Sequence, residues 1–136
     1  MSSVSTRPAV LDTSALLFWT LDPDTLTPAA RRTIDEALGR GGCVVSAISL
    51  WEIALKAKRG LLQLGLPATQ FAERLAKVKG LEIRAVDART WLHSVALTWA
   101  HRDPADRVIV ATADLLGGPL VTSDETMRSF YDRAVW

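Results

Sequence analysis

Hydrophobic residues follow two alternating patterns along this chain. Short runs of consecutive apolar residues are typical of buried strands, and we predict strands at residues 9–11, 43–45, 82–86, 120–122 and 133–136. Longer stretches carry apolar residues every three or four positions, which predicts helices at residues 13–19, 28–38, 46–60, 67–79, 90–100 and 103–116, with a short helix after Asp124. This alternation predicts an α/β fold, a single αβα sandwich around a mostly parallel central sheet.

Length and composition limit the chain to one ordinary globular domain. It has 136 residues, 49% of them hydrophobic and 23% charged, so two domains would each have a marginal core. Residues 1–8 are polar and aperiodic, and we expect a flexible leader before a domain at residues 9–136. No stretch resembles a secretion signal or a membrane span, so we expect a cytoplasmic protein without a membrane partner. Cys43, the single cysteine, lies in an apolar run and is predicted to be buried.

Charge and aromatic content leave several partners open. The chain has 16 basic and 15 acidic residues, and a net charge of +1 excludes bulk electrostatic capture of nucleic acid as the main interaction. A local basic group at residues 56–59 would suit RNA phosphates, or merely the negative end of a helix. Of the five tryptophans, Trp19 and Trp51 are assigned to the core, with burial by a partner as the alternative.

Four carboxylates occupy equivalent places near the ends of strands or the starts of helices. Asp12 follows the first strand, and Asp124 follows the strand at 120–122. Glu52 lies in the first turn of the helix after the second strand, and Asp106 lies in the first turn of the 103–116 helix. Because parallel strands end at one edge of a sheet, these side chains are expected to approach one another there. Ionised carboxylates repel each other at such distances, and a divalent cation removes the conflict. Oxygen ligands alone favour Mg²⁺ or Mn²⁺.

Each acid also has a purely structural interpretation as a helix cap. Asp12 would cap the helix that starts at Thr13, Asp103 the helix that starts at Pro104, and Asp124 or Ser123 the last helix. Residues 49–52 read Ser-Leu-Trp-Glu, which matches a capping box, so Glu52 would bond to a backbone amide. Both interpretations remain open at this point.

A cluster of oxygen ligands and a divalent cation suits hydrolysis of phosphodiester bonds. Several neighbouring side chains would orient ligands, water or phosphate, or else only cap and bridge: Thr13, Ser14, Thr122, Ser123, Asp103, Arg102 and Arg107. His101 would donate a proton to the leaving oxygen, or else lie in a surface loop.

Four ordered motifs in the sequence resemble those of the PIN-domain nucleases. They are LDTSAL at 11–16, SAISLWEIA at 46–54, HRDPADRVIVATA at 101–113 and LVTSD at 120–124. The third is highly specific, and together they span nearly the whole chain. The chain length and the residues of these motifs are similar to those of VapC toxins from type II toxin–antitoxin systems. The fourth motif departs from the family, whose members often carry a basic residue before its acid, and this would alter phosphate contact at that edge.

The resemblance implies a function and partners. It implies an endoribonuclease that depends on Mg²⁺ or Mn²⁺, forms a homodimer and is inhibited by a cognate VapB antitoxin. Carried onto this chain, it gives the acidic roles to Asp12, Glu52, Asp106 and Asp124, with Asp12 and Asp106 as direct metal ligands.

Two other functions compete with the toxin. A housekeeping RNA-processing nuclease would share the site but need no antitoxin. A non-catalytic signalling domain that binds Mg²⁺ through acids would have paired acids after its first strand and a lysine after a late strand. Here Asp12 is followed by Thr13, and Asp124 by Glu125, so the signalling pattern fails.

Overall fold

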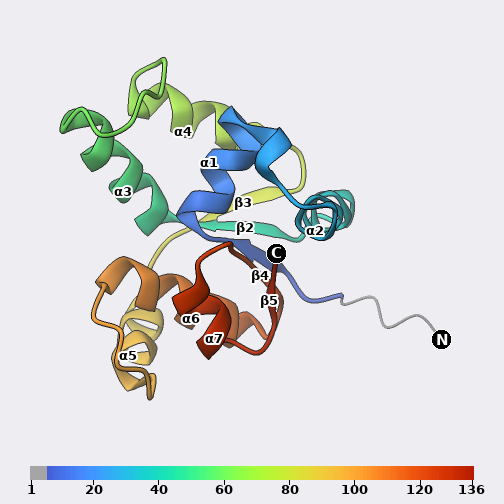
Figure 1. Ribbon diagram of the computed structural model, residues 1–136, viewed down its shortest axis with the longest axis vertical. Coiled ribbons are helices and arrows are strands. Elements are labelled where there is room, and N and C mark those ends of the chain that lie inside the picture. The colour runs from blue at the N-terminus through green and yellow to red at the C-terminus, as the bar shows by residue number, and fades with distance from the viewer. Residues whose placement is uncertain (1–5) are drawn as a thin grey trace.

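Five parallel strands form the central sheet in a computed structural model, which describes residues 6–136 (Figure 1). The strands are β1 (Ala9–Leu11), β2 (Cys43–Ser46), β3 (Leu81–Arg84), β4 (Leu120–Val121) and β5 (Ala134–Val135). Their order across the sheet is β3-β2-β1-β4-β5, and every neighbouring pair is parallel. The carboxyl ends of all five strands therefore lie at the same edge.

Helices cover both faces of this sheet, which confirms the predicted αβα sandwich (Figure 1). The helices are α1 (Thr13–Leu21), α2 (Pro28–Gly39), α3 (Ala47–Lys58), α4 (Ala68–Ala76), α5 (Ala88–Ala96), α6 (Pro104–Leu116) and α7 (Glu125–Phe130), with a short 3-10 helix η1 (Pro23–Thr25). Alternate strand residues face opposite layers: Leu11 packs in the core beneath α1, α2 and α4, whereas Val10 packs in the core beneath α6 and α7. Both side chains are completely buried.

Local signals placed most helix ends correctly. Thr27 caps α2 and accepts a hydrogen bond from the Ala30 amide, with Pro28 in the first turn as predicted. α6 ends at Leu116, and the capping residue Gly117 has a φ of 70°, the left-handed conformation that glycine adopts without strain. The predicted helix at 90–100 is displaced: α5 starts at Ala88, because Asp87 caps it, and ends at Ala96. An irregular segment at 97–103 then joins α5 to α6.

The start of α3 corrects one sequence-based interpretation. Ser46 is the N-cap, and its hydroxyl accepts a hydrogen bond from the Ile48 amide. The helix therefore begins at Ala47, so the capping box predicted at 49–52 is wrong and Glu52 lies in the second turn rather than the first. The competing cap is three residues earlier, at the point where β2 ends.

The remaining sequence-based expectations have mixed outcomes. Cys43 is buried as predicted, and burial raises the pKa of its thiol to about 12. Trp51 is 60% exposed, so its assignment to the core is wrong. Residues 1–5 of the expected leader lie outside the described residues, whereas the Arg7 carbonyl accepts a hydrogen bond from Arg40 of the domain. No helix within residues 6–136 is both long and apolar enough to cross a bilayer.

Candidate active site

Asp12 lies buried at the centre of the carboxyl edge, because β1 is flanked by β2 and β4. Its side chain is 2% exposed, and both oxygens have partners. Oδ1 accepts a hydrogen bond from the Ala15 amide at 2.7 Å, and Oδ2 accepts one from the Thr122 hydroxyl at 2.5 Å. The first contact confirms that Asp12 caps α1. The second links it to the residue that follows β4, so the carboxylate is fixed in the space between two strands.

Glu52 reaches the same edge from α3. The Thr13 hydroxyl donates to Glu52 Oε1 at 2.5 Å and lies 2.9 Å from the hydroxyl of Ser49. Thr13 directly follows Asp12, so the first motif holds one acid and contacts another. The sequence pattern predicted Ser49 only as a helix cap and not as a contact of Thr13 in the site. A usable signal existed, because Ser49 lies four residues before the buried Ile53 and thus on the inward face of α3.

Asp106 enters the site from the first turn of α6. Its backbone amide donates to Asp103 Oδ1 at 3.0 Å, which confirms Asp103 as the N-cap. Asp106 Oδ2 lies 2.7 Å from His101 Nε2, and the two side chains are 19% and 27% exposed. Burial raises the pKa of Asp106, while its hydrogen bond to His101 opposes that rise and the charges of Asp103 and Glu52 add to it.

Asp124 is the most exposed of the four acids. Its Oδ1 accepts hydrogen bonds from the Thr126 amide at 2.8 Å and the Met127 amide at 3.1 Å, so it caps α7 as one interpretation predicted. Its own amide donates to the Thr122 hydroxyl at 3.0 Å. Thr122 therefore contacts both Asp12 and Asp124, which makes it the link between the two acids at this side of the sheet.

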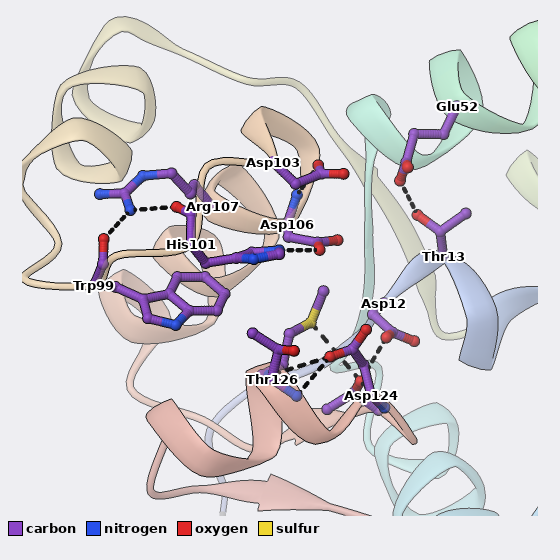
Figure 2. A network of polar contacts seen from close by, with 12 residues as sticks. Asp12, Thr13, Glu52, Trp99, His101, Asp103, Asp106, Arg107, Asp124 and Thr126 are labelled. Carbon is purple, nitrogen blue, oxygen red and sulfur yellow. Dashed lines mark hydrogen bonds and ion pairs between the residues drawn. The ribbon is translucent and has the colours of Figure 1, made fainter.

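The four carboxylates come from separate elements and surround one space (Figure 2). Burial raises the pKa of Asp12 to about 6, and the charges of Asp106 and Asp124 contribute to that rise, against the opposing bonds from Thr122 and Ala15. Within residues 6–136, however, no three His, Cys, Asp or Glu side chains lie close enough together to hold a metal ion. The fold thus gathers the acids at one edge without closing them into a compact ligand cage.

Arg107 has a different role from the phosphate contact or acid bridge that the sequence suggested. Its guanidinium donates to backbone carbonyls at the end of α5, at Ser94 and Val95, and in the segment between α5 and α6, at Leu97, Trp99 and His101. A planar group with five donors suits such a cluster of acceptors. Arg107 therefore stabilises the backbone of the segment that precedes α6, and its guanidinium does not face the acids.

The other polar residues predicted around the site have fewer contacts. Ser14 is exposed and Ser123 is half-buried, and neither side chain hydrogen bonds to another residue among 6–136. Arg102 is exposed. These three side chains are accessible to solvent beside the acids, whereas Thr13 and Thr122 are already engaged with them.

Comparison with known proteins agrees with this architecture. A family model described as PIN domain matches residues 9–133. Ribonuclease VapC22 of Mycobacterium tuberculosis is 36% identical over 122 residues, which cover 88% of this chain and 89% of that protein.

Solved structures of low identity share the fold. A toxin–antitoxin complex from Klebsiella pneumoniae matches with a TM-score of 0.63 at 20% identity, covering 94% of this chain and 96% of that chain. DNA-bound VapBC from Salmonella typhimurium matches with a TM-score of 0.63 at 19% identity, covering 95% and 96%. FitAcB from Neisseria gonorrhoeae matches with a TM-score of 0.59 at 23% identity, covering 93% and 94%. From the matched family model and the sequence relative, the chain belongs to the PIN-domain family.

Proposed function

We propose that this protein is an endoribonuclease toxin of a VapBC-type toxin–antitoxin module, which cleaves RNA phosphodiester bonds until a cognate antitoxin binds it. Its similarity to a VapC ribonuclease extends over 88% of the chain. Its fold is shared with chains of VapBC and other toxin–antitoxin complexes. The observation that carries the proposal is the buried Asp12, whose pKa is raised to about 6 at an edge where three further carboxylates face the same space.

The donor atoms at this edge are carboxylate oxygens, the kind of ligand that a divalent cation binds. The largest influences on the pKa of Asp12 are burial, two hydrogen bonds and two other carboxylates, and none of them is a cationic side chain. Mg²⁺ and Mn²⁺ prefer such oxygen ligands, and among the described residues Asp106 is the only one of the four acids that contacts a basic side chain, His101. We propose Asp12 and Asp106 as direct ligands, with Glu52 and Asp124 completing the acidic site. When bound, such a metal polarises the phosphoryl group and promotes ionisation of the attacking water.

The chain's own residues would then divide the remaining work. Thr122 and the Ala15 amide hold Asp12 in place, and Thr13 holds Glu52. Whichever of the four carboxylates does not bind the metal is available to accept a proton from the attacking water. Asp103 sets the start of α6, and Ser14 and Ser123 remain candidates for contact with phosphate or water.

A second copy of the chain is part of this proposal. Four of the exposed large apolar side chains lie on α3 and α5: Trp51, Trp91, Leu92 and Val95. A groove of about 460 Å³ between these elements is lined by apolar residues, including Trp51, Trp91 and Pro104, and by no charged side chain. A surface of this kind suits a protein partner better than an RNA backbone. Light scattering of the purified protein is expected to give twice the mass of the 14.8 kDa chain.

Expression in bacteria separates the toxin from a housekeeping nuclease. Induction of the wild-type chain is expected to arrest growth, and induction of Asp106→Asn is expected not to, because the variant lacks one proposed metal ligand. Co-expression of a short DNA-binding protein encoded beside the gene is expected to restore growth of wild-type cells. The measurements are optical density and viable counts after induction. Normal growth of cells that contain active wild-type ribonuclease would contradict the toxin role and favour the housekeeping alternative. Under either function we propose that the protein acts in the cytoplasm.

A further inference from the structure

The segment that leads into Asp106 is fixed by an internal cation. This segment joins α5 to α6 and has no regular secondary structure. Arg107 Nη1 donates to the carbonyls of Trp99 at 2.6 Å and His101 at 2.9 Å, while Nη2 donates to that of Leu97 at 2.9 Å and Nε to that of Ser94 at 2.9 Å. Charge-assisted hydrogen bonds of this kind are stronger than neutral ones. The backbone at His101 is therefore held firmly even though it belongs to an irregular segment.

The side chain of His101 is supported as well. Its ring packs on Trp99 with centroids 4.7 Å apart, and Trp99 stacks on Phe130 at 4.8 Å with an angle of 11° between the rings. Phe130 is the last residue of α7. The three rings form a column from α7 to the acidic site, which we call the ring column (Phe130, Trp99 and His101). His101 and Trp99 lie together beside Asp106 in Figure 2.

The ring column ends on one oxygen of a proposed metal ligand. His101 Nε2 lies 2.7 Å from Oδ2 of Asp106. No hydrogen bond within the described part of the chain engages Oδ1, so this oxygen remains available. An aspartate side chain held at one oxygen and free at the other presents a single ligand atom in a defined direction, and hydrogen bonds of this type orient metal-binding carboxylates.

We propose that His101 is a positioning residue: supported by Trp99 and by Arg107, it holds Oδ2 of Asp106 and so orients Oδ1 for the divalent cation. This inference rests on the proposed function, and it assigns the role to the hydrogen bond from Nε2 rather than to proton transfer to the substrate. It also gives the side chains of Arg107 and Trp99 their place in the site, since the Arg107 guanidinium donates to the His101 carbonyl and the Trp99 ring packs on the His101 ring.

A second histidine–aspartate pair in the same molecule provides a matched control. His93 of α5 lies 2.7 Å from Asp114 of α6, the same separation as in the His101–Asp106 pair. Asp114 does not take part in the proposed acidic site. A substitution at His93 therefore reproduces the loss of such a contact without touching that site.

The test measures Mn²⁺ binding by calorimetry and RNA cleavage for four variants. His101→Phe keeps a ring on Trp99 and removes the hydrogen bond, and we expect its Kd for Mn²⁺ to rise about tenfold or more. His101→Gln, whose amide nitrogen can take the position of Nε2, is expected to stay within about threefold of wild type. Trp99→Leu keeps the histidine but removes its ring support, and an intermediate increase is expected. His93→Phe is expected to bind Mn²⁺ and cleave RNA like wild type.

Different failures have different readouts. A His101→Phe variant with wild-type affinity for Mn²⁺ but a lower kcat would overturn positioning and indicate direct proton transfer. Failure of His101→Gln to rescue binding, with the melting temperature unchanged, would also overturn the hydrogen-bond role. If His101→Phe does not fold, the Kd of Trp99→Leu and of His101→Gln decides. Wild-type protein that neither binds Mn²⁺ nor cleaves RNA would instead overturn the proposed function, and this inference with it.

Discussion

Replacement of Asp12 by asparagine is expected to lower the rate of RNA cleavage by a factor on the order of 10³ or more, because it removes a negative ligand from the proposed metal site. The change is close to isosteric. The amide oxygen can still accept the bond from Ala15, and the amide nitrogen can donate to the Thr122 hydroxyl, so both contacts of the carboxylate have a replacement. Initial rates on single-stranded RNA at saturating Mn²⁺ measure the effect.

The same substitution is expected to stabilise the metal-free protein at neutral pH. The pKa of Asp12 is raised from 3.8 to about 6 in the folded state, mainly by burial, so the folded protein binds this proton more tightly than the unfolded chain. The resulting contribution to stability is present below pH 4 and is lost as the pH rises through 6, a difference of ~3 kcal/mol. Asp12→Asn removes this loss, so urea unfolding at pH 7.5 should show a higher free energy of unfolding than wild type.

A matched acid outside the site is the control for both measurements. Asp114→Asn removes a carboxylate that contacts a histidine, and it is expected to leave the cleavage rate unchanged. Cleavage by Asp12→Asn at the wild-type rate would contradict the site assignment. A less stable Asp12→Asn protein at pH 7.5 would show that the folded state stabilises the carboxylate as an anion, contrary to the direction of its pKa.

Removal of divalent metal is expected to reduce RNA cleavage to background. The carboxylates at this edge repel one another, and burial opposes the ionised form of both Asp12 and Asp106. A divalent cation would offset this repulsion and the charge of a phosphate held among the acids. Activity assays in EDTA, followed by dialysis and addition of Mg²⁺ or Mn²⁺, measure the loss and its recovery.

Metal binding has a second signature in thermal stability. A cation that binds only the folded protein stabilises it by about 2.7 kcal/mol at a concentration 100 times its Kd. The melting temperature is expected to rise with added Mn²⁺ in wild type and to respond much less in Asp12→Asn. Full activity in the chelator would contradict the metal mechanism. Recovery of Asp12→Asn stability by Mn²⁺ to the same extent as wild type would contradict the role of Asp12 as a ligand.

Much of the fold was predictable because its signals are local. The apolar runs around Val10 and Val44 indicated buried strands, and Thr27 with Pro28 marked a helix start. The acids were predictable as a group for a similar reason: residues that follow parallel strands share one edge, whatever the details of packing. The place of Asp12 at this edge was therefore predictable from sequence order alone. Asp12 both caps α1 and lies near other acids, so its two interpretations, as a helix cap and as a member of the acidic site, are compatible.

The role of individual side chains was decided by the tertiary structure. Nothing local distinguishes Ser46 from Ser49 as a helix cap, and the choice depends on where β2 stops. The guanidinium of Arg107 could have faced phosphate, until the irregular segment before α6 brought several carbonyls around it. His101 and Phe130 are far apart in sequence and meet through Trp99 only because α6 and α7 pack on the same face of the sheet.

The sequence by itself therefore determined the succession of strands and helices along the chain and the edge of the sheet at which the acids gather. Those properties follow from periodicity and chain direction, which are written into neighbouring residues. The tertiary structure alone decided that Asp12 is buried, that Trp51 is exposed, and that His101 rather than Arg107 contacts Asp106. Burial and side-chain direction depend on which elements pack together, and for these residues that packing joins segments distant in the chain.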